Sequence, residues 1–441
     1  MRLLRINSVA KVIESNSPVC RWYAIWFFAD MLHRETSHTQ GTWKWYNRGS
    51  CYSRQRTISR FFVFLAMNRT FWIDLIRVAG AFFVVLLHTS YRFAGGPMVE
   101  EAGNAYGSLG WLVTMFFLKF ACVAVPLFLM VSGALLLGRN EEMLTFYRKR
   151  FGKILLPFFA WSCIFVFCLW IAGRSFQDGT PITLFSSIGA FLSGGISGHF
   201  WFMYMLISLY LVAPFLAVFA RNASKNMLIG FLMLWFFAAF IFPVLNAIAK
   251  ETLDISDLAN FFPFESGTVS YSVGFFVTGY VLKDIVISKR WLLFAFVAWF
   301  LLALTPINSY LQMTYPDSSV SFIFVFLKNY VFPIISNPMT LAVIAFFCLR
   351  SIGDLPSVSS SRFGRAISTL APLTFGIFLC HHLFLVPSTQ ILDKLIKIGS
   401  AESWLFVLCA VPTLAVLIYF AAAVLIYVIR CNRYLKSLFA P

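Results

Sequence analysis

The sequence predicts an all-α integral membrane protein: a single bundle of about ten transmembrane helices, with both termini in the cytoplasm. Of its 441 residues, 60% are hydrophobic and 12% are charged, whereas soluble globular domains carry about 25% charged residues. The mean hydropathy is +0.79. The apolar residues form repeated runs of about 20, which is the length that crosses a bilayer core of about 30 Å.

The N-terminal segment, residues 1–66, differs from the rest of the chain. It contains ten Lys and Arg residues against three acidic ones and has no helical periodicity. Its apolar runs are too short to span a bilayer. Met67 then opens the sequence MNRTFWIDLIR directly before the first span. We expect residues 1–66 to be either an over-extended reading frame, with the true start at Met67, or a disordered cytoplasmic tail. Residues 67–441 form the membrane domain.

Ten apolar segments after Met67 are predicted to be membrane spans. Prolines fall within several of them, and prolines at membrane depth are tolerated where neighbouring helices satisfy the freed carbonyls. The spans cover residues 71–91, 111–137, 150–173, 200–220, 227–248, 270–286, 291–307, 322–349, 367–391 and 404–429.

The connections between the spans predict the orientation. Basic residues cluster in segments 139–153, 289–290 and 430–436, while 251–265 is acidic. Because Lys and Arg accumulate on the cytoplasmic side, this alternation places both termini there. The same rule accounts for the net charge of +17, so no nucleic-acid partner is expected.

The nine cysteines are scattered and mostly lie inside apolar segments. No CxxC pair and no Cys/His spacing of a metal site occurs, so the sequence indicates neither a disulfide framework nor a bound metal.

The first span, FWIDLIRVAGAFFVVLLHTSY, carries three ionisable residues: Asp74, Arg77 and His88. Arg77 and His88 are eleven residues apart, which is three helical turns plus roughly 20°, so they share one face about 16 Å apart. Asp74 and Arg77 can pair one turn apart. Ionisable groups inside a span are costly and mark a site that faces the bundle interior. Arg77 either forms only this pair or faces a cavity and holds a substrate group.

Three further histidines, His199, His381 and His382, fall at a depth similar to that of His88, in the outer half of the membrane. Each could simply be hydrogen-bonded to a neighbouring residue. Their common depth instead favours a shared polar cavity. Histidine is the usual general base near neutral pH.

A basic segment that contains Arg148, Lys149, Arg150 and Lys153 precedes the third span. Ordinary positive-inside charge, in contact with lipid headgroups, explains it as well as a binding site does. The functional alternative is a site for an anionic cytoplasmic donor with several phosphates.

Five ordered motifs resemble the acyltransferase family 3 membrane proteins, which O-acylate cell-surface glycans in bacteria. The length and the absence of a fused hydrolase-like domain are closest to the stand-alone branch, such as the enterobacterial common antigen O-acetyltransferase. The resemblance covers Met67 to the end. The motifs are the D-x-x-R and R-x₁₀-H pattern of Asp74, Arg77 and His88, then VPLFLMVSG, RFGKILLPF, GHFWFMY and FGIFLCHHLF.

The resemblance implies transfer of an acetyl group from cytoplasmic acetyl-CoA, as a co-substrate and without a metal, to a sugar hydroxyl. The chemistry needs a base and a stabilised oxyanion. His88 is then the candidate base, and Arg77 holds the thioester or the CoA arm. Arg148, Arg150 and Lys153 would bind the CoA phosphates.

The acceptor side is expected to include His199, Trp201 and Tyr204, since aromatic faces commonly pack against sugars. His381 takes the histidine position of the last motif, while His382 stands where the family has proline, which weakens the case for this helix. The acceptor would be a glycan or lipid-linked saccharide at the bacterial inner membrane, among membrane lipids. The sequence does not indicate which glycan or which oligomeric state.

Two other functional classes fit a multi-span bundle with intramembrane Arg and His. One is a transporter or flippase for lipid-linked glycans, against which stands the lack of an inverted-repeat signal. The other is a non-catalytic partner of a polysaccharide synthase.

Overall fold

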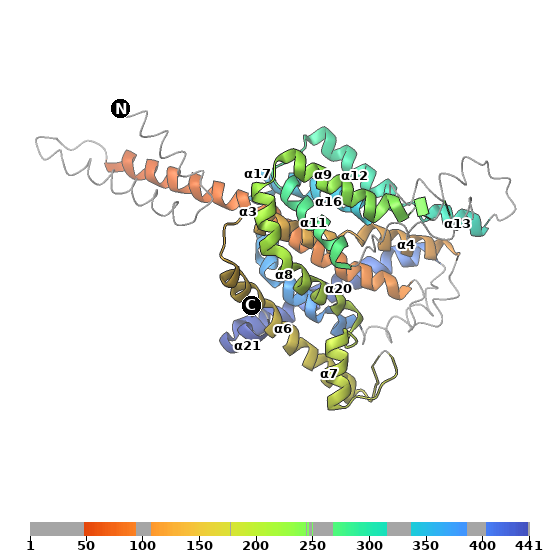
Figure 1. The fold of residues 1–441 in the computed structure, drawn as a ribbon. Coiled ribbons are helices and arrows are strands. Elements are labelled where there is room, and N and C mark those ends of the chain that lie inside the picture. Colours follow the sequence, from red (N-terminus) through yellow and green to blue (C-terminus); the bar gives the residue numbers. More distant parts are fainter. Residues whose placement is uncertain are drawn as a thin grey trace, which may run out of the picture. The chain divides into compact units, whose positions relative to one another are not determined.

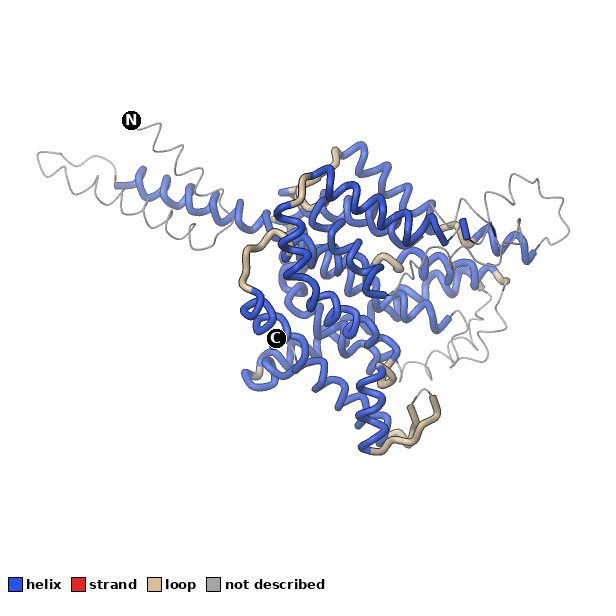
Figure 2. The backbone as a smooth tube through the Cα atoms, in the orientation of Figure 1, coloured by secondary structure: helices blue, strands red, loops and turns tan. Residues whose placement is uncertain are grey.

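The computed structural model describes residues 48–93, 107–176, 178–243, 245–246, 249, 268–314, 337–385 and 403–439. Every regular element in these residues is a helix (Figures 1 and 2). By its internal contacts the chain divides into two units, Met1–Phe64 and Leu65–Pro441.

The elements follow in chain order, with a further helix at residues 374–385 directly after η6. They are α3 (Arg48–Phe93), α4 (Leu109–Ala121), α5 (Ala124–Leu136), α6 (Met143–Ile171), α7 (Leu184–Ser193), η2 (Gly198–Phe200), α8 (Trp201–Asn222), α9 (Lys225–Phe236), η3 (Phe237–Ile241), α11 (Thr268–Leu282), α12 (Lys289–Ala303), α13 (Ile307–Thr314), α16 (Pro338–Gly353), α17 (Pro356–Ser359), α18 (Arg362–Leu370), η6 (Ala371–Leu373), α20 (Trp404–Cys431) and α21 (Arg433–Phe439).

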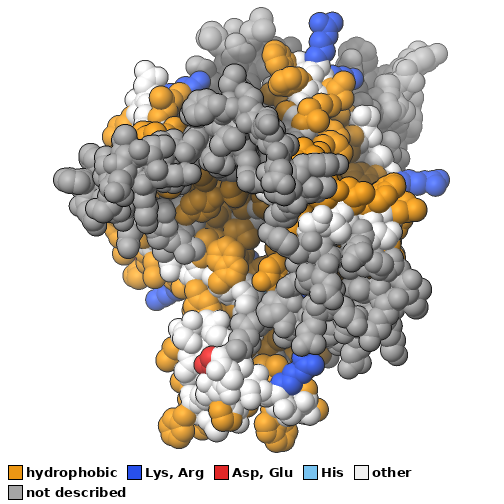
Figure 3. Space-filling view, turned by 90° about the vertical axis from the view of Figure 1, so that its right-hand side faces the viewer, with side chains coloured by type: hydrophobic (Ala, Val, Ile, Leu, Met, Phe, Trp, Pro, Cys, Tyr) orange, Lys and Arg blue, Asp and Glu red, His pale blue; other side chains and the backbone are white. Residues whose placement is uncertain are grey.

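Six helical segments in the described part of the chain are long and apolar enough to cross a membrane. They make this a multi-pass membrane protein. Figure 3 shows one face on which the described side chains are mainly hydrophobic, with scattered Lys and Arg, as contact with lipid requires. The six segments are Phe71–Phe93, Leu109–Leu136, Met143–Ile171, Gly198–Asn222, Arg362–Leu385 and Trp404–Cys431.

These six segments coincide with six of the predicted spans to within about eight residues at each end. Helices α9, α11, α12 and α16 stand at the positions of the other four, but each is shorter than the roughly 20 residues that a bilayer requires. The number of about ten crossings and the orientation therefore stay predictions. Residues 251–265, 322–336 and 386–391, on which part of that topology depends, lie outside the described residues.

Helix α3 begins at Arg48, well before the first predicted span. Residues 48–66, whose sequence has no helical periodicity, belong to this helix. Residues 1–47 lie outside the described part of the chain. The start of translation at Met67 stays a prediction.

The predicted continuous span 111–137 is broken between α4 and α5, at Cys122 and Val123. Pro126 explains the break, because its ring has no N–H and clashes with the carbonyl four residues earlier, at Cys122. The π-helical turn η3 similarly precedes Pro243. In both places the regular α-helical hydrogen bonding is interrupted just before a proline.

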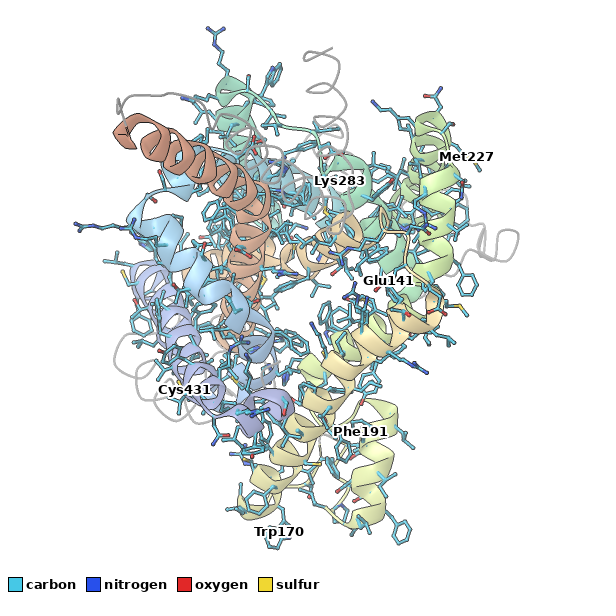
Figure 4. The ribbon with its side chains drawn as sticks, turned by 90° about the vertical axis from the view of Figure 1, so that its left-hand side faces the viewer. Glu141, Trp170, Phe191, Met227, Lys283 and Cys431 are labelled. Carbon is cyan, nitrogen blue, oxygen red and sulfur yellow. The ribbon has the colours of Figure 1, made fainter. Side chains whose placement is uncertain are left out.

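Helix α7 lies in a connection for which the sequence indicated no helix. Thr183 and Ser186 form a capping box at its start, and Gly194 ends it with φ 83°, a conformation that favours glycine. Phe191 packs against Phe158 and Phe159 of α6, with ring centroids 5.4 and 5.7 Å apart. Figure 4 shows α7, with Phe191, beside the half of α6 that ends near Trp170.

Helices α5 and α11 pack with their backbones in contact. A Cβ atom at Gly133 would lie 1.7 Å from the carbonyl oxygen of Phe276, and one at Gly279 would lie 1.9 Å from that of Met130. Small residues permit such close approach between membrane helices. These two glycines therefore fix the spacing of the helices that form one wall of the site.

We expect Gly133→Ala to lower the free energy of unfolding by about 1–3 kcal/mol, because the added methyl group forces α5 and α11 apart. Gly230→Ala in α9 is the matched control, since nothing lies within 4 Å of its added Cβ. Thermal unfolding in detergent measures both variants. Equal midpoints for Gly133→Ala and Gly230→Ala would contradict this account of the packing.

Candidate active site

Helix α3 carries both ionisable groups that the sequence placed on one face. Arg77 and His88 are separated by eleven residues of continuous helix, about 16 Å along the axis. Both side chains are half-buried. The structure places them in two different polar regions, which we describe in turn.

The four histidine rings of the membrane domain lie together. The ring centroids of His88 and His382 are 4.7 Å apart, those of His199 and His382 are 4.0 Å apart, and those of His88 and His381 are 5.3 Å apart. They come from three elements: α3, η2 and the 374–385 helix. The common depth read from the sequence thus corresponds to one cluster, which we call the histidine cluster.

Hydrogen bonds define the state of His199. Its Nε2 lies 3.2 Å from the backbone carbonyl of Leu379, and its Nδ1 lies 2.9 Å from the hydroxyl of Ser197. A carbonyl can only accept, so Nε2 donates and Nδ1 accepts from Ser197. Both ring nitrogens of this buried side chain are therefore used.

His381 and His382 are satisfied less completely. Nδ1 of His381 lies 2.7 Å from the carbonyl of Phe378 and donates to it, which leaves a lone pair on Nε2. That Nε2 atom and Nε2 of His382 are buried without a hydrogen-bond partner among the described residues. Unpaired buried polar atoms are costly and point to a functional role. The cluster therefore holds an unused buried acceptor at Nε2 of His381.

A cavity of about 400 Å³ opens beside the cluster. His88 and His199 lie in its wall, and the rest of the lining is mainly apolar. The break between α4 and α5 forms one side of it. The lining residues are Val84, Leu87, His88, Cys122, Ala124, Val125, Pro126, Leu129, His199, Trp201, Phe202, Met205, Tyr271, Phe275, Pro338 and Phe378.

The two aromatic residues expected on the acceptor side have different positions. Trp201 lines the cavity and is 47% exposed. Tyr204 lies outside the lining, and its hydroxyl donates to the carbonyl of Phe191. Tyr204 thus joins α8 to α7.

The second polar region surrounds Arg77. The charges of Arg77 and Arg150 both act on the hydroxyl of Tyr210, which also interacts with the side chain of Ser132. Among the described residues no ion pair joins Asp74 to Arg77. The positive charge of Arg77 nevertheless acts electrostatically on the carboxyl group of Asp74. The positive charges of Arg77 and Arg150, from two separate motifs, therefore both act electrostatically on one tyrosine.

Glu141 neutralises part of the basic segment. Its carboxylate lies 2.6 Å from Nζ of Lys149 and 3.4 Å from Nη2 of Arg150. The hydrogen bond from Lys149 holds the pKa of Glu141 below its usual range, so this carboxylate is charged at neutral pH. Figure 4 shows Glu141 just before α6. Arg148 and Lys153 are exposed on the same helix.

Sequence reasoning missed Glu141, Ser197 and the contribution of Tyr271 to the cavity. For Glu141 a signal existed, since an acid within a basic segment suggests internal pairing. No such signal existed for Ser197 and Tyr271, because an isolated hydroxyl in an apolar chain carries no spacing pattern.

His199→Ala should lower the free energy of unfolding by about 1–3 kcal/mol, since the Ser197 hydroxyl and the ring stack on His382 lose their partner. Thermal unfolding of the purified variant measures this loss. Trp201→Ala is a suitable control, because that neighbouring side chain is half exposed. An unchanged midpoint for His199→Ala would show that the two hydrogen bonds do not stabilise the fold.

The comparison with known protein families gave a match that includes the residues of both polar regions. A family model for the acyltransferase domain numbered 3 matches residues 70–429. Searches of curated proteins and of solved structures gave no match. The match confirms the resemblance at the level of the family and identifies an acyltransferase. Because it spans most of the chain, this protein belongs to the acyltransferase 3 family of membrane acyltransferases.

Proposed function

We propose that this acyltransferase is a membrane O-acetyltransferase of the bacterial inner membrane. It moves an acetyl group from cytoplasmic acetyl-CoA to a hydroxyl of a cell-surface or lipid-linked glycan. Enterobacterial common antigen, O-antigen and exopolysaccharide are candidate acceptors. The observation that carries the proposal is the position of His88, in the wall of a mainly apolar cavity of about 400 Å³.

His88 acts as the general base in this proposal. The described residues provide no hydrogen-bond partner to its ring, which is half-buried and lines the cavity. Its lone pair accepts the proton of the sugar hydroxyl as that oxygen attacks the thioester carbonyl. Collapse of the tetrahedral intermediate breaks the C–S bond, and the departing CoA sulfur takes the proton from His88. The acetyl ester and free CoA are the products.

The donor binds from the opposite end of α3. Arg150, with the exposed Arg148 and Lys153, supplies positive charge for the CoA phosphates. Arg77 holds the CoA arm or the thioester. The roughly 16 Å from Arg77 to His88 suits a long flexible pantetheine arm that extends along one face of the helix. Glu141 pairs with both Lys149 and Arg150, so its single negative charge offsets part of this positive charge while no donor is bound.

His88→Gln should lower the acetyl-transfer rate by a factor of about 10²–10⁴, the usual contribution of a general base. The assay supplies acetyl-labelled CoA and candidate glycan acceptors to the purified protein in lipid. Tyr91→Phe is the matched control, because Tyr91 lies one turn further on the same helix and is 51% exposed.

Full transfer by His88→Gln would contradict the role of His88. If the wild-type protein transfers no label to any acceptor, and a deletion strain loses glycan export, the protein is a flippase. If it transfers no label and export continues, it is a non-catalytic assembly partner.

Arg150→Gln should raise KM for acetyl-CoA by about 10–100-fold, because a charge-assisted hydrogen bond contributes about 1.5–3 kcal/mol. The rate at saturating donor should change much less, since Arg150 binds the CoA phosphates and not the thioester in this scheme. Arg362→Gln, an exposed arginine on α18, is the control. A fall in kcat at unchanged KM would instead assign Arg150 to the chemical step.

A further inference from the structure

Three members of the histidine cluster point nitrogen atoms at one another. His88, His381 and His382 each offer one ring nitrogen, and these three atoms all lie within 4.8 Å of one another. Neutral imidazole nitrogen is the commonest protein ligand of transition metals. This convergence is a property of the tertiary structure, because residue 88 is almost 300 positions away from the other two in the chain.

The surroundings of His381 match those of a metal ligand. Its Nδ1–H donates to the backbone carbonyl of Phe378 over 2.7 Å, which fixes the ring and leaves the lone pair on Nε2. Metal-binding histidines typically donate their other N–H to a carbonyl or carboxylate in this way. Nε2 of His381 is fully buried and has no hydrogen-bond partner among the described residues, and the same holds for the buried Nε2 of His382.

His199 belongs to the cluster but not to this set of ligands. Its two ring nitrogens are occupied by the Leu379 carbonyl and the Ser197 hydroxyl. It stacks on His382 with ring centroids 4.0 Å apart and an angle of 27° between the planes. His199 therefore supports the ring of His382 and leaves three imidazoles as ligands.

We propose that His88, His381 and His382 bind a first-row divalent cation, best represented by Zn²⁺. Three histidines around tetrahedral Zn²⁺, at Zn–N distances of about 2.0–2.1 Å, leave the fourth position for water or a substrate atom. Tetrahedral geometry at these distances places the ligand nitrogens about 3.3 Å apart. The present separations, which are within 4.8 Å, would have to shorten to that value when the ion binds.

Access and charge both affect this site. His88 lines the cavity, which gives the cation a route of entry. Arg92, one turn beyond His88, acts electrostatically on both His88 and His382. Its positive charge opposes a bound cation, so the site is weaker than its three ligands alone would make it.

Metal binding itself does not depend on acyl transfer. The effect of a bound cation on the reaction, however, rests on the proposed function. A coordinated imidazole has no lone pair for a proton. A bound cation and the base role of His88 therefore exclude each other.

The test measures binding of Zn²⁺ alone to the full-length protein in detergent, after removal of any affinity tag. A chromophoric chelator competes for the metal. We expect one equivalent bound by the wild-type protein, and binding weakened at least 10–100-fold in His381→Leu and His382→Leu. Mutation of a residue that only hydrogen-bonds to a metal ligand lowers metal affinity by about 10–100-fold. Loss of a ligand itself should lower the affinity at least as much. His33 and His38 remain in every variant, so their contribution cancels.

Three further measurements separate loss of the site from loss of the fold. His382→Cys should keep Zn²⁺ binding, because a thiolate replaces the imidazole as ligand. Arg92→Gln should bind Zn²⁺ more tightly. Zn²⁺ should raise the unfolding temperature of the wild type and His382→Cys but not of the two Leu variants. Equal Zn²⁺ binding by the wild type and both Leu variants would overturn the proposal, whatever the acetyl-transfer activity of the protein.

Discussion

The hydrogen bond from Nε2 of His199 to the carbonyl of Leu379 is the interaction on which the site depends. It joins η2, the short helix directly before α8, to the 374–385 helix, two segments 180 residues apart in sequence. A polar ring in a membrane bundle must find its partners inside the protein, because the lipid offers none. Ser197 satisfies the second nitrogen, so His199 is held from both sides. Its ring then forms the surface against which His382 stacks.

The acyltransferase carries two polar regions connected by one helix. At one end of α3 His88 joins the histidine cluster beside a mainly apolar cavity. At the other end the charges of Arg77 and Arg150 both act on the hydroxyl of Tyr210. This separation suits a reaction in which a charged donor and a sugar acceptor approach from different sides. In the histidine cluster, His88, His381 and His382 each bring one ring nitrogen to within 4.8 Å of the other two. Arg77 and Arg150 belong to the other polar region.

The prediction of the site from sequence was strongest where helix geometry alone decides. Eleven residues of helix place Arg77 and His88 on one face whatever surrounds them, and similar depth brought the four histidines to the same level of the membrane. Their contacts could not be predicted, because rotation of each helix about its own axis decides which side chains meet. Tyr204 illustrates this limit, since its hydroxyl contacts α7, a helix that the sequence did not indicate. Pro126 can be read from the sequence. That the helix break at this proline forms one side of the cavity could not be predicted from it.

By itself the sequence determined the helical membrane class, the approximate positions of the six long apolar helices and the ordered motifs of the family. These follow from local properties: apolar length, helical period and residue spacing. Only the tertiary structure decided that Gly133 and Gly279 bring α5 and α11 into backbone contact, and that His88 meets His381 and His382. The physical reason is the same in each case. These contacts join segments distant in the chain, and close packing inside the bundle, rather than any local preference, selects them.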